Sequence, residues 1–496
     1  MSMNKKKKIV FLPLDERPCN YHFPIVLYGG EYELELPPFE LMGRKKQPAD
    51  TDAIAKWLVR NSAKADGIII AADTLIYGGI IPSRLHRLDY KTLTKRLDII
   101  RDVRKVAPKI PIYVFNLIMR CPQFSVNVEE PDYYGECGRE IFLKGEALHK
   151  RELGLDTLGK KEFAEIEAKI PSDCYADFMG RREVNRRVNL AVIDLLRDGV
   201  IDMLLIPQDD SAEFGHTAKD QSFVRQYVKQ NKLQDKVYMY PGADETGLTL
   251  LARMINNFYG KRPKVFVMYS SRNGGEAVPV FEDRPVAETI KYQLLAAGCL
   301  RWENPDTADI ILAVNPPPHA ANETERTIIE FCELAEEFVR MDKPVAIADT
   351  AGGEDHLRPV FEQKKLLMKL AGYAAWNTSS NTLGTCISQA VKFLHEGATA
   401  NHKNFMALRL VEDIGYCTVV RKDVQENVLP RLGLHKYNVD GERGEVSKII
   451  KKKLEEFVAS HLPSLSKNIF VHDCLLPWNR TFEAGLEVEY KDTDKP

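Results

Sequence analysis

Short, uninterrupted apolar runs recur along this chain and alternate with longer amphipathic stretches. Amphipathic stretches such as 90–106 and 182–199 have the apolar spacing of helices with one buried face. A run that is apolar at consecutive positions is typical of a strand buried on both faces, as in a parallel sheet covered by helices. The pattern therefore predicts an α/β protein. The predicted strands are 8–14, 67–72, 110–117, 202–207, 236–241, 264–269, 309–314, 344–349 and 371–377.

Changes in this pattern divide the chain into regions. A long insertion rich in Tyr and Glu separates the third and fourth runs, and we expect it to cover the carboxyl ends of the strands. A Gly-rich loop follows residue 270, and a more charged region closes the chain. We predict a (β/α) barrel-like parallel-sheet domain followed by a smaller α/β domain, with open doubly wound sheets as the alternative, because strand order is invisible in a sequence. The predicted boundaries are 1–261 with insertion 118–180, 262–400, and a C-terminal α+β extension at 401–496 that contains a β-hairpin at 406–424.

Polar residues follow the predicted strands at the point where each strand ends. In α/β proteins ligands bind outside the carboxyl ends of the strands, in closed barrels and open sheets alike. We expect these side chains to meet at one mouth, although the two acids of "GADETG" have the alternative role of first-turn acids in the next helix. The residues are Asp15, Glu16, Arg17, Asp73, Asn116, Arg120, Asp209, Asp210, Asp244 and Glu245.

The segment "PQDDSAEFGH" places two adjacent carboxylates where an apolar strand ends. Successive side chains diverge in a turn, so the environments of Asp209 and Asp210 can give one proton donor and one anion. The alternative is an Asx-type cap on the next helix. A cap needs neither a second Asp nor the preceding Gln208, so we interpret the pair as catalytic.

Three further residues have a binding role and a structural role open to them. Arg17 can hold a carboxylate, a phosphate or a sugar hydroxyl, or can form an ion pair with Asp15. Tyr77 precedes a Gly pair, which permits close approach of a ligand or a tight turn. Asn377 precedes a helix whose first N–H groups can bind an anion or form a plain N-cap.

Composition narrows the classes of function. The chain has 496 residues, 44% hydrophobic and 28% charged, with a formal net charge of −2. It has no basic field for a nucleic-acid backbone, and its apolar runs are too short for a membrane span or a signal-peptide core. We expect a cytoplasmic protein with no nucleic-acid or membrane partner, and a homo-oligomer is compatible with the sequence. The nine cysteines are scattered without a CxxC pair, so we expect free thiols.

Cofactor motifs are missing from the sequence. Neither GxGxxG nor GxxxxGK[ST] occurs, and we expect no cofactor. His216 with the strand-end aspartates would make an oxygen-rich site suited to Mg²⁺ or Mn²⁺. A lone His after a turn is more often a surface or satisfied residue, so we expect no resident metal.

Six phrases spread over the chain resemble the bacterial domain-of-unknown-function family 4127. They are "PLDERPCN", "ADTLIYGG", "PQDD", "PGADE", "FEDRPVAET" and "AAWNTSSNTLGT". A looser resemblance, by position and chemistry alone, is to glycoside hydrolases of the hexosaminidase type, which carry two consecutive acids at the end of the fourth barrel strand. That resemblance implies that Asp209 orients a substrate N-acetyl group and that Asp210 is the general acid.

These observations lead to one functional hypothesis and two alternatives. We expect an intracellular glycoside hydrolase that acts on short oligosaccharides, including ones that contain N-acetylhexosamine, with Asp209 and Asp210 as its catalytic residues. Either the substrate assists, or one Asp pairs with a carboxylate from another strand end. Phe124, Tyr133 and Tyr134 of the insertion are candidates for stacking on a sugar. The alternatives are a Mg²⁺- or Mn²⁺-dependent hydrolase, lyase or isomerase, and a protein that binds an anionic ligand.

Overall fold

The structure is a computed structural model that describes residues 6–317, 325–352 and 355–492. The chain forms two compact units, each assembled from separate segments. The first unit contains 1–16, 32–247 and 280–284, and the second contains 17–31, 248–279 and 285–496. Within the described residues, no helix is both long and apolar enough to cross a bilayer.

A parallel sheet of six strands forms the centre of the first unit. Its order is β2-β1-β3-β4-β5-β6, and all five neighbouring pairs are parallel. The central strands are buried on both faces because nearly all their residues are apolar, as in "GIIIA" of β3. The strands are β1 (Lys8–Leu12), β2 (Glu33–Glu35), β3 (Gly67–Ala71), β4 (Ile112–Phe115), β5 (Met203–Leu205) and β6 (Val237–Tyr238).

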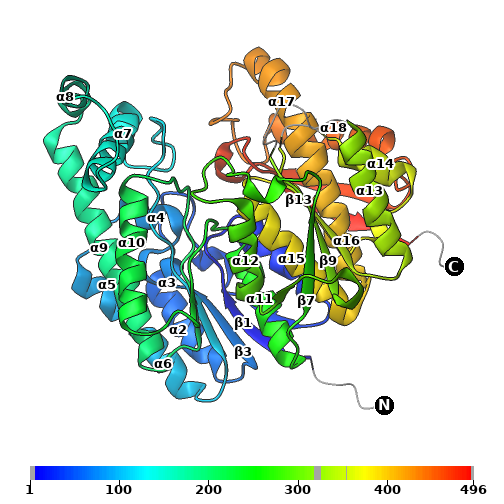
Figure 1. Cartoon of the computed structure of the whole chain (residues 1–496), viewed down its shortest axis with the longest axis horizontal. Coiled ribbons are helices and arrows are strands. Elements are labelled where there is room, and N and C mark those ends of the chain that lie inside the picture. The colour runs from blue at the N-terminus through cyan, green and yellow to red at the C-terminus, as the bar shows by residue number, and fades with distance from the viewer. Residues whose placement is uncertain (1–5, 318–324, 353–354, 493–496) are drawn as a thin grey trace. The chain divides into compact units, whose positions relative to one another are not determined.

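Helices between these strands pack against one another beside the sheet. Contacts join α2 to α6, α5 to α6 and α9, and α9 to α10. Figure 1 shows these helices gathered on one side of β1 and β3. Two of them begin at aspartate caps: Asp50 accepts the N–H of Ala53, and Asp89 accepts the N–H of Thr92. The helices are α2 (Thr51–Ser62), α5 (Tyr90–Leu97), α6 (Ile99–Val106), α9 (Ser172–Arg197) and α10 (His216–Gln230).

Two short helices and the insertion lie at the carboxyl ends of this sheet. Helices α3 (Ala72–Tyr77) and α4 (Ile80–Leu85) follow β3 directly. The predicted insertion begins as an extended loop over 118–133 and continues into α7 (Tyr134–Glu152) and α8 (Lys160–Ala168). Figure 1 shows α7 and α8 at the same end of this unit as the start of α9.

The second unit contains a parallel sheet of five strands in the order β11-β10-β9-β7-β8. Helix α12 (Val286–Ala296) contacts α15 (Ser379–Glu396), and α13 (Glu325–Arg340) contacts α14 (Leu357–Gln363). Figure 1 shows these two pairs on opposite sides of β7 and β9. The strands are β7 (Lys264–Tyr269), β8 (Leu300–Trp302), β9 (Ile310–Asn315), β10 (Val345–Asp349) and β11 (Gly372–Ala374).

Both sheets are open, which confirms the α/β class with the doubly wound alternative and not the barrel-like closure. In a (β/α) barrel the strands follow one another in a single direction around the sheet. Here the chain moves from β1 outward to β2 and then returns across β1 to β3, and β7, β8 and β9 repeat this reversal. Strand order with such a switch point belongs to doubly wound folds, in which ligands bind at the carboxyl ends.

The C-terminal region is mainly helical. Helix α16 (Ala400–Arg409) continues into η5, a π-helical stretch over Leu410–Val420, so the predicted hairpin at 406–424 is wrong. Helical spacing brings Arg409 against Glu412 and against Asp413, which lies at 2.8 Å. The antiparallel pair of this region lies later, in β12 (Ile469–Leu475) and β13 (Gly485–Tyr490), and packs beside α18 (Glu445–His461) and α16.

Candidate functional site

Hydrogen bonds connect the carboxyl ends of adjacent strands in the first unit. The Thr74 hydroxyl, just after β3, donates to the carbonyls of Pro13 and Leu14 just after β1. Beyond β4 and β5, Ile118 and Gln208 form an isolated parallel bridge, and Gln208 forms another with Pro241 beyond β6. The polar residues that follow these strands therefore lie along one edge of the sheet.

Asp73 is a buried carboxyl group at this edge, 2% exposed. It accepts hydrogen bonds from Asn116 Nδ2 at 3.1 Å and from the N–H of Leu117 at 3.0 Å. Asn189 of α9 donates to Asn116 Oδ1 at 2.6 Å, which orients the Asn116 amide so that its NH₂ group points to Asp73. Burial raises the pKa of Asp73 to about 7, although these hydrogen bonds act to lower it. The charge of Asp209 adds to the rise.

Asp209 and Asp210 diverge from the turn after β5 and pair with different arginines. Asp209 is paired with Nη2 of Arg84, a residue of α4 whose side chain is 3% exposed. Asp210 has a positive φ of 35° and accepts a hydrogen bond from Arg120 Nη1 at 2.8 Å. Its side chain is 22% exposed, against 11% for Asp209. Burial raises the pKa of Asp210, Arg120 opposes the rise, and the Asp209 carboxylate adds to it.

Two carboxylates of the 118–133 loop complete this arrangement, which we call the acidic cluster. Glu129 Oε2 lies 3.1 Å from Arg84 Nη1 and 2.9 Å from Arg120 Nη2. Glu130 Oε1 lies 3.3 Å from Arg84 Nη1 and 2.7 Å from Arg120 Nε, whereas its Oε2 is buried without a hydrogen-bond partner in the described chain. Four carboxylates thus share two guanidinium groups, and this excess of negative charge favours binding of a proton. The acidic cluster consists of Arg84, Arg120, Glu129, Glu130, Asp209 and Asp210.

Neighbouring residues hold the loop that carries Arg120. Arg182 of α9 donates to the carbonyl of Arg120 at 2.9 Å and pairs with Asp220 of α10 at 2.6 Å. The Tyr134 hydroxyl donates to the carbonyl of Pro122 at 2.9 Å. These contacts tie the start of the insertion to the helices beside the sheet.

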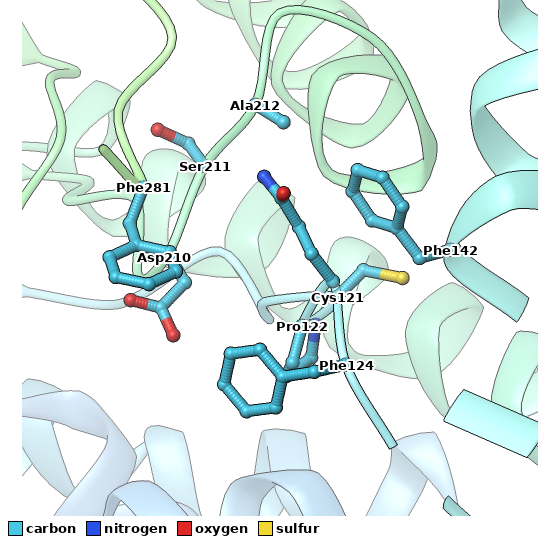
Figure 2. A pocket seen from close by; sticks show the side chains of 9 residues that line it. Cys121, Pro122, Phe124, Phe142, Asp210, Ser211, Ala212 and Phe281 are labelled. Carbon is cyan, nitrogen blue, oxygen red and sulfur yellow. The ribbon is translucent and has the colours of Figure 1, made fainter. Parts of the chain in front are cut away.

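A small cavity lies against Asp210. Its volume is about 10 Å³, which is room for about one water molecule. Figure 2 shows Asp210 with Phe124 and Phe281 at one side of this cavity and Phe142 at the other. Phe124 and Phe281 are 41% and 38% exposed, and their ring centroids lie 6.4 Å apart. An exposed pair of aromatic rings therefore borders the carboxyl group.

The remaining acids predicted in this unit also follow β1 and β6. Asp15 and Asp244 are buried, and Glu16 accepts the N–H of Lys45 at 2.8 Å. Glu245 is fully buried and accepts the N–H of Ala243 at 3.0 Å. Burial raises the pKa of Glu245 to about 8, and the charge of Asp244 adds to the rise.

Three further predicted binding residues, Tyr77, Arg17 and Asn377, also lie outside the acidic cluster. Tyr77 of α3 lines a separate pocket. Arg17 and Asn377 belong to the second unit. There Arg17 stacks over the Trp478 ring at 4.4 Å and lies 3.9 Å from Glu483, and Asn377 is an exposed residue with a φ of 53° just after β11.

The aromatic residues proposed for sugar stacking have different environments. Phe124 is exposed beside Asp210. Tyr133 is half-buried and donates its hydroxyl to Asp177 at 2.8 Å. Tyr134 is fully buried against Phe178, so its ring is out of reach of a substrate and the stacking prediction is wrong for this residue.

Sequence reasoning missed Arg84, Glu129, Glu130 and Phe281. Arg84 lies on a helix, and the two glutamates lie in a loop, where no strand-end rule applies. Phe281 belongs to the "FEDRP" segment. This segment follows all six strands of the first sheet in the sequence, yet it packs against the end of that sheet. The N–H of Ser211 donates to the Phe281 carbonyl at 2.8 Å, and Arg284 donates to Gln208 Oε1 at 2.7 Å. The presence of this segment among the six family phrases was the available clue.

His216 does not join the strand-end carboxylates. It begins α10, is 5% exposed and packs against the rings of Tyr175 and Phe178. Burial lowers its pKa to about 3. Over the residues that the structure describes, no group of three His, Cys, Asp or Glu side chains has the arrangement of a metal site. The described cysteines are free thiols, most of them buried.

Comparison with known proteins identifies the family. One solved structure that resembles this chain is the α,α-trehalose 6-phosphate synthase of Burkholderia multivorans, at 11% identity and a TM-score of 0.19, covering 82% of this chain and 92% of that one. A TM-score this low supports no conclusion about fold or function. No curated protein matches. The family model described as "Protein of unknown function (DUF4127)" matches residues 9–487, which confirms the resemblance read from the six phrases. The chain therefore belongs to the DUF4127 family.

Proposed function

We propose that this protein is a glycoside hydrolase in which Asp210 is the general acid. The observation that carries the proposal is the difference between two adjacent carboxyl groups. Asp209 is paired with the buried guanidinium of Arg84, whereas Asp210 is more exposed and has a raised pKa. Environments that separate the pKa values of two carboxyl groups are the usual way in which enzymes assign an acid and an anion.

Asp210 would protonate the oxygen of the leaving group as the glycosidic bond breaks. Asp209 would remain charged. It would either orient an N-acetyl group whose oxygen attacks the anomeric carbon and is later displaced by water, or stabilise positive charge at the anomeric carbon while water attacks it directly. Asp210, which Arg120 holds in place, would take back a proton from the water that adds at the anomeric carbon, and would then be protonated for the next turnover. The excess of carboxylates over guanidinium groups in the cluster supports that step.

The exposed rings beside Asp210 support a carbohydrate substrate. A sugar ring presents a face of C–H groups that packs on aromatic side chains, and Phe124 and Phe281 offer such surfaces. The cavity beneath them is too small for a sugar. A short oligosaccharide would therefore lie on the rings, outside the cavity, with its glycosidic oxygen at Asp210.

The test is a comparison of aryl glycosides whose leaving groups differ. The wild-type protein should hydrolyse 4-nitrophenyl glycosides from a panel that includes N-acetylglucosaminides. Asp210→Asn should lower kcat/KM on that substrate by about 10²–10⁴-fold. The loss should be much smaller on the matching 2,4-dinitrophenyl glycoside, because that leaving group departs without protonation.

Full activity of Asp210→Asn, or an equal loss on both substrates, would contradict the role of general acid. Assays with and without EDTA run on the same samples. Loss of wild-type activity in EDTA and its recovery with Mg²⁺ or Mn²⁺ would favour the metal-dependent alternative.

A further inference from the structure

A second pocket in the first unit lies beside α3 and α4 and does not border the acidic cluster. Its volume is about 330 Å³, which is within the range of small-molecule sites. Residues of 46–51 and 77–88 form most of its wall, together with Arg96 of α5. No residue lines both this pocket and the cavity at Asp210.

The charged side chains at this pocket are all basic. Lys46, Arg87 and Arg96 line it, and no Asp or Glu does. Among the described residues Lys46 pairs only with Asp132, at 3.3 Å, and the Asp132 side chain is 94% exposed. Such an exposed ion pair contributes little to stability, so a ligand can replace Asp132 as the partner of Lys46 at little cost.

Neither arginine forms a salt bridge within the described residues, although the charge of Arg87 is felt by the Asp177 carboxylate. Arg96 donates Nη1 to the carbonyl of Ile76 at 2.6 Å, and no carboxylate of the described chain lies within 4 Å of its guanidinium. Arg87 is exposed and has no ion pair within the described residues. The described carboxylates therefore offset the positive charge of this pocket only in part, through Asp132 at Lys46 and the charge of Asp177 near Arg87.

Tyr77 adds a polar group that lacks a partner. Its side chain is 3% exposed and lines the pocket, and its hydroxyl has no hydrogen bond within the described chain. The hydroxyl is not among the fully buried unpartnered polar atoms of the described chain, so it faces the pocket, where water or a ligand can hydrogen-bond to it. The His86 ring lies 4.8 Å from the Tyr77 ring.

His86 contributes a neutral wall. Its Nδ1 accepts the N–H of Leu88 at 3.2 Å, so Nε2 carries the hydrogen and donates to Asn185 Oδ1 at 2.7 Å. Thr51, the first residue of α2, also lines the pocket, which places the positive end of that helix dipole at the wall.

We propose that this pocket binds a small molecule that carries a phosphate monoester. The phosphate would lie among Lys46, Arg87 and Arg96, and a hydroxyl of the ligand would bond to Tyr77. A phosphate monoester has about two negative charges and three acceptor oxygens, which suit three basic side chains better than a single carboxylate does. Proline, alanine and leucine residues form the remaining wall. The proposal does not depend on the function proposed for Asp210.

Titration calorimetry of the full chain tests it, with glucose 6-phosphate, inorganic phosphate and glucose as probes. We expect saturable binding of glucose 6-phosphate, weaker binding of phosphate and none of glucose. Arg96→Gln should raise the Kd of glucose 6-phosphate by about 10-fold or more, since a hydrogen bond between charged groups is lost. Tyr77→Phe, which keeps the ring, should raise it by about 3- to 10-fold.

Two variants serve as controls. Arg101→Gln removes an arginine of α6 that pairs with Asp198 and does not line the pocket, and Asp210→Asn alters only the other cavity. Both should bind glucose 6-phosphate as the wild type does, and thermal melts should show that all variants are folded. Two results would overturn the proposal. One is that glucose 6-phosphate does not bind saturably, and the other is that its Kd is unchanged in both Arg96→Gln and Tyr77→Phe.

Discussion

Three carboxyl groups at the carboxyl ends of β3 and β5 differ because their nearest partners differ. Asp73 has amide donors and no cation within 4 Å in the described chain, Asp209 has a buried arginine, and Asp210 shares an arginine with two glutamates. Amide donors stabilise a carboxylate less than a guanidinium does. Asp73 therefore lacks the cation that stabilises the charged form of the other two carboxyl groups.

Asp73 should make stability depend on pH. Its pKa is about 7 in the folded state and near 3.8 when unfolded, so the folded protein holds the proton more tightly. This stabilisation is complete below about pH 4 and is lost as the pH rises to about 7. The difference amounts to a few kcal/mol, by about 1.4 kcal/mol per pKa unit.

Asp73→Asn removes the titration and keeps an oxygen to accept the N–H groups of Asn116 and Leu117. Urea unfolding at pH 5 and pH 8.5 measures the effect. We expect the variant to gain stability relative to the wild type at the higher pH. Parallel changes in both proteins between the two pH values would contradict the assignment.

The residues that sequence reasoning found are those that follow strands. Asp73, Asn116, Asp209 and Asp210 lie at one edge because parallel strands end at the same side of a sheet. Arg84 could not be found in this way, because it lies on helix α4. Its pairing with Asp209, 125 residues away, depends on where that helix packs. Glu129 and Glu130 depend in the same way on the course of a loop.

At the scale of elements, the strands were easier to predict than their order. All nine predicted runs contain a strand, because a continuous apolar run of that length is typical of a strand buried on both faces. The strands β2 and β8 were missed, since "ELE" and "LRW" are short, partly charged edge strands. The hairpin predicted at 406–424 is wrong, because the spacing of Arg409, Glu412 and Asp413 is helical.

Helix α4 anchors the 118–133 loop through one side chain. Arg84 pairs with Glu129 and Glu130 of that loop and with Asp209 after β5. Its removal leaves buried carboxylates with too few partners, which costs about 3–5 kcal/mol. Arg84→Gln should lower the free energy of unfolding by that amount and make the loop a site of early proteolytic cleavage.

Arg101→Gln is the matched control for this change. It removes an arginine whose pair with Asp198 is exposed, and such pairs contribute about 0–1 kcal/mol. Urea unfolding and limited proteolysis with mapped cleavage sites compare the two variants. Equal stability of the two variants would show that Arg84 is not the anchor.

At the scale of the whole molecule, the chain passes between its two units five times. It does so after residues 16, 31, 247, 279 and 284. The predicted boundaries at 261 and 400 assumed that each domain is continuous. The compact units instead assign 17–31 to the same unit as 248–279 and 285–496. A continuous sequence pattern contains no sign of such an exchange, because α1 (Pro18–Tyr28) looks like any helix that follows a first strand.

Helix α1 is built into the core of the second unit. The Tyr28 hydroxyl lies 2.6 Å from Ser388 Oγ, and Asn401 Nδ2 donates to the carbonyl of Val26 at 2.7 Å. The guanidinium of Arg409 lies over the Phe23 ring at 3.9 Å. A fragment that starts at residue 248 lacks all these contacts and exposes the apolar surface on which α1 packs.

We therefore expect fragment 248–496 to melt without a cooperative transition and to bind the dye ANS, whereas the full chain melts cooperatively. Joining residues 17–31 to the fragment through a flexible linker should restore part of the transition, because the linker returns α1 to its partners without the rest of the first unit. Circular dichroism melts of the three proteins measure this. A cooperative melt of fragment 248–496 at the temperature of the full chain would show that the second unit is complete without α1, and that the continuous boundary is the correct one.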